Sequence, residues 1–553
     1  MRIGLLQLNP IVGDISGNTQ KLIDAIKSVQ ADLIVTPEMA ICGYPPRDLL
    51  VNKEFLQACE ESVAKVCQEC SNSSNTIVIT HPRVDAVTDR MRNSASVLQH
   101  GEIIATSDKQ LLPSYDVFDE KRYFESGDVP CVFTHGEHTI GIAICEDFWR
   151  GFDANVASMY DFNPLDQLVA AGCNIILSPS ASPFVTGKRE AHLKYASEFS
   201  KEFGVSVAVC NQVGGNDDLV FDGGSFVASP SGILGELPVF DSGTLSVELT
   251  DKPVDVNDKC AEEERWGALV LGTRDYFVKT GHSTAFLGIS GGIDSALVAT
   301  IATAALGKDA VTGVLMPSRF SSLGSVQDAE LLASKIGIQT ITLPIEHMHA
   351  AFERTLSESC LDVTGVASEN AQARIRGLLL MAMANEQGAL VLATGNKSEL
   401  AVGYTTLYGD MDGAISVIGD IHKTDAWPLA NWVNANSAGC GFESAPIPES
   451  SISKAPSAEL RPNQLDQDSL PEYSELDRVL RLHVDCDLGI EEIEEQLNVP
   501  TEFIERVVRM VDIAQFKRDQ AAVILKTSPR TFGRGRRMPI VMKRSWSSTR
   551  ETT

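Results

Sequence analysis

The stretch "FLGISGGIDSALVAT", residues 286–300, decides the fold of the second half of the chain. Its apolar start is typical of a buried β-strand, and its end has the composition of a helix. Glycines let a backbone approach an anion closely, and the free amides of a helix N-terminus favour phosphate. The residues between strand and helix that fit this role are Ser290, Gly291, Gly292, Asp294 and Ser295. The stretch therefore predicts a phosphate-binding loop. The alternative is a purely structural role, a tight turn followed by a helix that Asp294 caps.

Strand-like and helix-like segments alternate strictly around this loop. Further apolar segments at 311–317, 338–344 and 389–395 are each followed or preceded by a helical pattern, of which 370–387 is the longest. Repeated βα units predict a parallel sheet with ligands beyond the carboxyl ends of its strands. The carboxylate of Asp294 at such an end can also reach a magnesium ion carried by phosphates.

The first half of the chain has a different rhythm. Strand-like segments mix with helices and with a hairpin at 94–107 that turns at His100–Gly101. This mixture predicts a layered α/β sandwich. A chain of 553 residues exceeds the size of one core. Since 249–264 is polar, acidic and interrupted by proline, we expect domains at 1–248 and 265–553 with this linker between them.

The composition excludes several classes of protein. Asp and Glu total 74 against 46 Lys and Arg, a net charge of −28, which argues against a nucleic-acid partner, even for the basic C-terminal stretch. No apolar run is long enough for a membrane span, and the N-terminus lacks the pattern of a signal peptide. The 12 cysteines form no paired framework, and the CxxC of Cys67 and Cys70 has no second pair for zinc. We expect a cytoplasmic protein.

Three reactive residues in the first half follow strand-like segments. Glu38 follows "LIV", Lys109 follows "IIATSD" and Cys145 ends "TIGIAIC". A cysteine is a strong nucleophile only as its thiolate, so it needs a base or a cation nearby. Taken alone, Cys145 fits a buried core residue. Together the three residues can form a base, an oxyanion stabiliser and a nucleophile.

The loop at 286–300 resembles the pyrophosphate loop of the N-type ATP pyrophosphatases, which cleave ATP between its α and β phosphates. Because such a loop holds the departing pyrophosphate, it needs no P-loop lysine. Downstream, 369–377, 393–414, 418–424 and 455–473 resemble the NAD synthetases within that group. The resemblance implies a Rossmann-like domain with ATP-binding residues Gly288, Ile289, Ser290, Gly291, Gly292, Ile293, Asp294, Ser295 and Thr394.

The same resemblance implies the remaining ligands of this domain. Glu399 is expected near deamido-NAD or the magnesium ion, and Asp294 at the metal. Asn370 and Lys517 are expected to contact the dinucleotide, although taken singly both fit solvent-facing helix positions. ATP is the expected substrate and Mg²⁺ the expected cofactor.

The order Glu38, Lys109, Cys145 resembles the nitrilase superfamily, and "LPSYDVFDEKRYF" with "CEDFW" resembles the glutaminase domain of glutamine-dependent NAD synthetases. The resemblance covers nearly the whole chain and implies an αββα first domain. It also implies that Cys145 attacks glutamine, that Glu38 transfers protons and that Lys109 stabilises the oxyanion. Tyr115, Ser182 and Lys188 are then expected to bind glutamine; a lysine suits its α-carboxylate.

The resemblance implies a C–N bond-forming ligase that amidates deamido-NAD with glutamine-derived ammonia, and a homo-oligomer. One alternative is an amidotransferase for another adenylated acid. Another is a first domain that serves only as a scaffold, with free ammonia as the donor. The sequence departs from the family pattern at Arg47, where an acidic residue is usual, and at Asp412 and Ser416.

Overall fold

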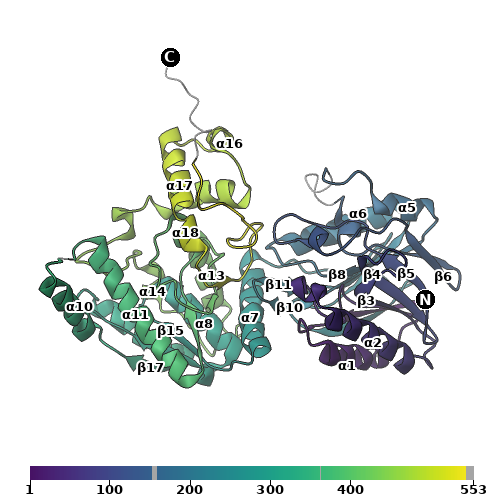
Figure 1. Cartoon of the computed structure of the whole chain (residues 1–553), viewed down its shortest axis with the longest axis horizontal. Coiled ribbons are helices and arrows are strands. Elements are labelled where there is room, and N and C mark those ends of the chain that lie inside the picture. Colours follow the sequence, from purple (N-terminus) through teal and green to yellow (C-terminus); the bar gives the residue numbers. More distant parts are fainter. Residues whose placement is uncertain (152–157, 362, 544–553) are drawn as a thin grey trace, which may run out of the picture. The chain divides into compact units, whose positions relative to one another are not determined.

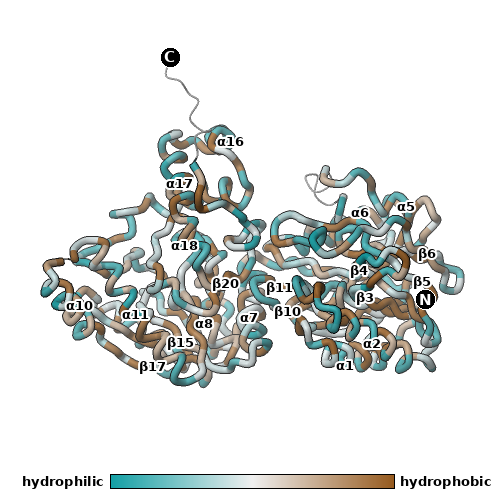
Figure 2. The backbone as a smooth tube through the Cα atoms, in the orientation of Figure 1, coloured by the Kyte–Doolittle hydropathy of each residue, from teal (hydrophilic) through white to brown (hydrophobic). Residues whose placement is uncertain are grey.

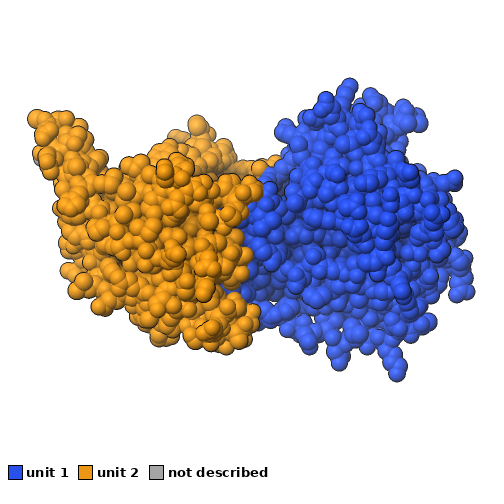
Figure 3. Space-filling view, turned by 90° about the horizontal axis from the view of Figure 1, so that it is seen from below, with its two compact units in different colours: residues 1–279 blue, residues 280–553 orange. Residues whose placement is uncertain are grey.

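The structure is a computed structural model that describes residues 1–151, 158–361 and 363–543. The chain divides into two compact units, residues 1–279 and 280–553, which are coloured separately in Figure 3. Helix α7 (Ala261–Thr280) begins inside the residues expected as the linker and belongs almost wholly to the first unit. The domain limits at 248 and 265 stay a prediction, and each unit is described below by itself.

The first unit contains two six-stranded sheets packed face to face (Figure 1). Ile3 and Val78 of one sheet share a buried cluster with Ile140 and Val207 of the other. In spatial order the first sheet comprises β14 (Gly243–Glu248), β1 (Arg2–Gln7), β2 (Leu33–Val35), β3 (Thr76–Val84), β4 (Met91–Gln99) and β5 (Glu102–Asp108). The second comprises β13 (Gly232–Glu236), β12 (Phe226–Ser229), β9 (Ser206–Asn211), β8 (Ile175–Ser180), β7 (His138–Ile142) and β6 (Cys131–His135).

Helices cover the outer faces of both sheets. Helices α1 (Ile15–Ser28) and α2 (Lys53–Glu69) bury one apolar stripe each against the first sheet, and Figure 2 shows them alternating between hydrophilic and hydrophobic. Helix α6 (Lys188–Phe203) packs on β12 and β9, next to α3 (Glu146–Trp149) and α5 (Pro164–Ala170). The predicted αββα sandwich is therefore confirmed, as is the hairpin, since β4 pairs antiparallel with β5.

The second unit is built on one parallel sheet (Figure 1). Its order is β17 (Gln339–Thr342), β16 (Val311–Leu315), β15 (Ala285–Gly288), β18 (Leu390–Ala393), β19 (Ile415–Ser416) and β20 (Val523–Ile524). β15 pairs in parallel with both β16 and β18. The chain therefore adds strands first on one side of β15 and then on the other, so the strand order reverses there. The phosphate loop follows β15 at this switch point, which is where open α/β sheets bind ligands.

Helices surround this sheet and extend it into a C-terminal helical cluster. They are α8 (Ile293–Leu306), α9 (Leu323–Ile336), α10 (Glu346–Glu358), α11 (Val366–Gln387), α12 (Lys397–Val402), α13 (Lys423–Ala435) and α14 (Glu449–Ser453). The cluster adds α15 (Tyr473–Leu480), a π-helical turn (Arg481–Asp485), α16 (Ile490–Gln496), α17 (Thr501–Ile513) and α18 (Gln515–Arg518). The expected Rossmann-like architecture is confirmed.

The start of α8 differs in one respect from the sequence expectation. Gly292, not Asp294, occupies the N-cap position, and no side chain caps the helix there. Asp294 lies inside the first turn of the helix, and its carboxylate contacts the ammonium group of Lys423 instead. Gly291 has φ +83°, and a Cβ at that residue would lie 2.3 Å from the carbonyl oxygen of Ser325, so the loop conformation requires glycine.

Within the described residues, none of the helices combines the length and the apolar character that crossing a bilayer requires. All cysteines there have free thiols, including Cys67 and Cys70 in the predicted CxxC.

Candidate active sites

The first unit brings Glu38, Lys109 and Cys145 together from both sheets. Glu38 follows β2, Lys109 follows β5, and Cys145 precedes α3 just beyond β7. The Nζ atom of Lys109 lies 2.8 Å from Oε1 of Glu38, and both side chains are almost fully buried. Cys145 is also buried, with its charge environment set by Glu38 and Lys109. A predicted base, cation and nucleophile therefore share one water-poor site.

A second carboxylate, that of Glu120, completes the site. The sequence analysis did not identify it as a site residue. Glu120 Oε1 accepts hydrogen bonds from Lys109 Nζ and from the Tyr44 hydroxyl, both at 2.8 Å. Burial raises the pKa of Glu120 to about 7, an effect that Lys109 opposes. Burial alone would lower the pKa of Lys109, but Glu120 and Glu38 outweigh it and hold that pKa well above its ordinary value. Lys109 is therefore charged between two carboxyl groups.

Glu38 is held in place from several sides. Its Oε1 accepts the amide of Asn93 at 2.7 Å, and its Oε2 accepts the backbone N–H of Ala181 at 3.2 Å. Asn93 lies on β4 and Ala181 just past β8, so both sheets fix the carboxylate. Such fixation keeps a general base within reach of its proton without reorganisation.

Cys145 has an unusual backbone and a protonated resting state. Its φ of +47° is rare for a residue with a side chain and places it on a sharp strand-to-helix turn. Burial and the nearby Glu38 raise the pKa of its thiol well above the ordinary value, whereas Lys109 and the backbone N–H of Ala181 lower it. The thiol must therefore lose its proton to a neighbouring base when it reacts.

The residue after Cys145 binds two phenol groups. Glu146 accepts hydrogen bonds at 3.0 Å from the hydroxyls of Tyr115 and Tyr160. Burial raises the pKa of Glu146 despite the opposing charge of Lys109. The structure thus places the predicted Tyr115 beside Cys145, through a carboxylate and a second tyrosine that sequence patterns did not single out.

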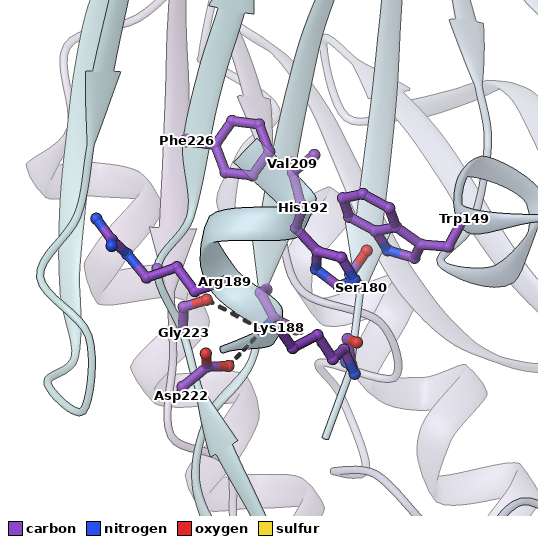
Figure 4. Close-up of a pocket in the computed structure, with 12 residues that line it drawn as sticks. Trp149, Ser180, Lys188, Arg189, His192, Val209, Asp222, Gly223 and Phe226 are labelled. Carbon is purple, nitrogen blue, oxygen red and sulfur yellow. Dashed lines mark hydrogen bonds between the residues drawn. The ribbon is translucent and has the colours of Figure 1, made fainter. Parts of the chain in front are cut away.

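Ser182 and Lys188 line a small cavity of about 20 Å³ in the same unit. Trp149 and His192 stack along it with ring centroids 3.8 Å apart, while Arg189 extends toward the opposite side (Figure 4). Asp222 lines it as well, and burial raises the pKa of this carboxyl to about 6. Lys188 Nζ donates to the carbonyl of Pro183 at 2.6 Å. The cavity thus offers two cationic groups, Lys188 and Arg189, and one acidic group, Asp222.

The unexpected Arg47 has a structural explanation. Its guanidinium lies 2.7 Å from Asp217 and 3.0 Å from Asp218, in the turn between β10 (Val213–Asn216) and β11 (Leu219–Asp222). An arginine is compatible with this position because two acidic residues face it.

The second unit contains a much larger cavity, of about 310 Å³, at the carboxyl ends of β15, β16 and β18. The phosphate loop forms one wall, and Gly291 is absent from the lining because it packs against Ser325. The predicted residues that line the cavity are Gly288, Ile289, Ser290, Gly292, Ile293, Asp294, Ser295, Thr394 and Glu399. The unexpected Asp412 lines it too.

A lysine from outside the loop supplies the charge that the loop lacks. Lys423, at the start of α13, places Nζ 2.5 Å from Asp294 Oδ2 and 3.7 Å from Glu399 Oε1. Burial raises the pKa of Glu399 to about 8, with a further contribution from Asp294. Burial alone would lower the pKa of Lys423, but the two carboxylates outweigh it. This cationic residue lies inside the quoted segment 418–424 but was not identified from sequence.

Asn370 and Lys517 lie behind this cavity rather than in its lining. Asn370 accepts the hydroxyl of Thr406 at 2.9 Å, and Lys517 donates to the carbonyls of Gly403 and Thr405 at 2.7 and 2.6 Å. Both residues therefore hold the segment after α12, of which Tyr404 and Thr405 face the cavity.

The carboxylates of this cavity suit one particular class of metal site. The described part of the chain contains no group of three or more histidine, cysteine, aspartate or glutamate residues that could hold a metal ion by itself. Asp294 and Glu399 are adjacent through Lys423, and Oδ1 of Asp294 is buried without a hydrogen-bond partner. One or two carboxylates supplemented by phosphates are how proteins usually bind Mg²⁺.

Comparison with known proteins matches both units. The carbon-nitrogen hydrolase family matches residues 2–252, and the NAD synthase family matches residues 265–521. A glutamine-dependent NAD(+) synthetase of Synechocystis is 44% identical over 97% of this chain and 98% of its own. That of Thermotoga maritima is 38% identical over 98% of each chain. A solved glutamine-dependent NAD+ synthetase of Acinetobacter baumannii, in complex with ADP, is 35% identical with a TM-score of 0.76 over 98% of both chains.

Proposed function

Because the chain belongs to the glutamine-dependent NAD(+) synthetases, we propose that it amidates deamido-NAD to NAD, with ATP as the second substrate and glutamine as the nitrogen donor. It is a ligase that forms a C–N bond. The observation that carries this conclusion is the presence in one chain of a buried Glu–Lys–Cys set and of a loop that lines a large cavity and contacts Lys423 through Asp294.

In the first unit, Cys145 is the nucleophile that attacks the side-chain carbonyl of glutamine. Glu38 accepts the thiol proton and delivers it to the departing ammonia, so that a thioester and free ammonia form. Lys109 stabilises the negative oxygen of the tetrahedral intermediate. Glu38 then accepts a proton from water, which splits the thioester to glutamate and restores the thiol. The preformed contacts of Lys109 with Glu38 and Glu120 support these roles.

Glutamine selection falls to residues around the small cavity. Lys188 pairs with the substrate's α-carboxylate, and Ser182 donates a hydrogen bond to it. Tyr115 orients the substrate from the side of Glu146. The joint placement of Ser182 and Lys188 along one cavity supports their assignment to a single subsite.

In the second unit, residues 288–295 and Thr394 bind ATP with its phosphates on the loop. A carboxylate oxygen of the nicotinate attacks the α-phosphorus, and pyrophosphate leaves. Ammonia from the first reaction attacks the resulting acyl adenylate, loses a proton and displaces AMP. Lys423 lies where it can neutralise phosphate charge at the loop. Glu399, Asn370 and Lys517 order the dinucleotide, the latter two through the segment 403–406.

Asp294 and Glu399 are the residues that would hold Mg²⁺. The ion's chemistry there is to neutralise phosphate charge as pyrophosphate departs. The unpartnered oxygen of Asp294 supports this assignment, because a nearby divalent cation favours the ionised form of a carboxyl group. The cytoplasmic location and the homo-oligomer expected from the sequence stay predictions.

A product assay tests the proposal. The full-length chain is incubated with deamido-NAD, ATP and magnesium, once with glutamine and once with an ammonium salt, and NAD, AMP, pyrophosphate and glutamate are quantified. We expect equal amounts of NAD and AMP in both, and glutamate only with glutamine. Xanthylate and aspartate replace deamido-NAD as controls. Amidation of either in preference to deamido-NAD would contradict the proposal and favour another amidotransferase.

A further inference from the structure

The C-terminal segment 526–536 of the second unit contains several buried residues, although its sequence suggests a basic surface tail. Lys526, Thr527, Thr531, Phe532 and Arg536 are each at most 5% exposed. The segment continues from β20 at the edge of the sheet and lies beyond the NAD synthase match, which ends at residue 521. A buried polar segment needs hydrogen-bond partners, and the Ser528 hydroxyl and the Arg530 carbonyl find theirs at α12.

At the N-terminus of α12, the fully buried Lys397 is the first partner. Its Nζ contacts the Ser528 hydroxyl at 2.6 Å and the carbonyl of Arg530 at 2.8 Å. The same Nζ lies 2.8 Å from Asp420 and 2.6 Å from Asp485. Lys397 thus connects the C-terminal segment to two carboxylates from other parts of the unit. A buried ammonium with four partners is strongly oriented.

Asp420 binds the same segment through hydrogen bonds from its other side. One carboxylate oxygen accepts the backbone N–H groups of Thr527 and Ser528, each at 2.7 Å, and the other accepts the Ser528 hydroxyl at 2.9 Å. Ser528 is therefore shared between Lys397 and Asp420, which hold this turn of the segment from two sides.

At the other end of α12, Arg518 closes the arrangement. Its guanidinium donates to the carbonyls of Leu400 and Ala401 at 3.3 and 2.5 Å, which lie in the last turn of the helix. It also lies 4.7 Å from the ring centroid of Phe532, while Lys397 Nζ lies 6.0 Å from that ring. One aromatic ring of the segment therefore contacts both cations that fix the ends of α12.

This arrangement reaches the cavity through adjacent residues. α12 carries Glu399, two residues after Lys397, and Ser398 Oγ accepts the backbone N–H of Lys423 at 2.9 Å. His422, next to Lys423, lies 2.9 Å from the same Asp485 that contacts Lys397. Lys397 and His422 are absent from the cavity lining, so they act on the cavity through Glu399 and Lys423.

We propose that residues 527–532 form a strap, locked by Lys397, that positions Glu399 and Lys423 for the adenylation of deamido-NAD. Lys397 is then a positioning residue of the synthetase site. The inference rests on the proposed function, because the step that it affects belongs to that reaction.

The test uses the full-length chain and ammonium-driven NAD formation. For Lys397→Met we expect kcat to fall about 100-fold, the loss typical of a misplaced catalytic geometry, with a KM for ATP within about threefold of wild type. Ser528→Ala keeps every charge and should lower kcat about fivefold, the size of one lost hydrogen bond. The matched control is Arg537→Ala, which removes an exposed charge from the same stretch and should leave kcat unchanged.

A double variant separates positioning from stability. Lys397→Met leaves buried carboxylates without their cation and should lower the melting temperature. Adding Asp420→Asn removes one of these charges, so the melting temperature should recover while kcat stays low. Recovery of both, or a wild-type kcat in either single variant, would overturn the strap. If the wild-type chain forms no NAD, the proposed function fails instead, so the two failures are distinguishable.

Discussion

The two candidate sites of this chain hold similar charges but differ in the space beside them. In the first unit, Lys109 lies 2.8 Å from both Glu38 and Glu120, and one oxygen of Glu120 has no hydrogen-bond partner. None of these three residues lines the cavity of about 20 Å³ in that unit. In the second unit, Asp294 and Glu399 share one cation, Lys423, beside a cavity of about 310 Å³, and one oxygen of Asp294 has no partner.

The difference follows from what each site has to bind. Amide hydrolysis involves a small neutral group, and a closed, preorganised set of charges stabilises its intermediate well. Adenylation brings in a polyphosphate. Its negative charge must be neutralised by cations and by backbone amides, which carboxylates cannot do. A pair of carboxyl groups that lines an open cavity is compatible with a site completed by a cation that arrives with its substrate.

The largest expected effect separates the two sites outright. Cys145→Ala removes the only atom that forms the thioester, so glutamine-driven NAD formation should fall at least about 10⁴-fold. Ammonium-driven NAD formation should stay close to wild type, because the second site is untouched. Both rates are measured by NAD production under matched conditions. Undiminished use of glutamine would contradict the assignment of the nucleophile and return the first unit to the role of a scaffold.

The reciprocal change sits in the phosphate loop. Asp294→Ala should lower NAD formation about 10³-fold with either nitrogen source, because the loop loses a carboxylate that faces phosphate and metal. Glutamine hydrolysis, followed as glutamate release, should persist. A matched control is Ser283→Ala, in the exposed turn before β15, which should change neither reaction. Persistent NAD formation by Asp294→Ala would refute its metal role.

The next largest effect is expected at Lys423, the cation that contacts Asp294 of the loop. Lys423→Met should lower NAD formation about 100-fold with either donor, since it removes the charge that faces phosphate and leaves two carboxylates unpaired. Lys423→Arg keeps the charge and should recover part of the rate. Initial rates at saturating ATP distinguish the two variants. Equal rates for Met and Arg would show that the ammonium charge is not what the site uses.

The smallest effect concerns stability and pH. The pKa of Glu399 is raised to about 8, so the folded chain keeps a proton that the unfolded chain loses above about pH 4.5. Stability should therefore fall as pH rises between these values. In Glu399→Gln this contribution is absent, so its melting temperature should drop less between about pH 5 and about pH 8. Melting curves in a chelator measure the drop, and equal drops in both chains would contradict the shift.

The sequence predicted more of the first site than of the second. Glu38, Lys109 and Cys145 each follow a short apolar segment, and that local signal placed them at strand ends. Glu120 lacks such a signal, because it begins a short 3₁₀ turn outside the strands and meets Lys109 only through the tertiary fold. Asn370 and Lys517 were expected as ligands; in the structure they bond within the segment after α12, Asn370 to the Thr406 hydroxyl and Lys517 to two backbone carbonyls.

Some properties were determined by the sequence alone: the α/β class of both units, the phosphate loop at 288–295, the hairpin at His100–Gly101 and the family. These properties depend on the spacing of residues along the chain, which the sequence records directly. The tertiary structure alone decided that Lys423, 129 residues from Asp294, supplies the cation of the loop. It also decided that a basic C-terminal stretch is buried against α12. The physical reason is that a buried charge takes its partner from whichever segment the fold brings near, and no sequence pattern records that distance.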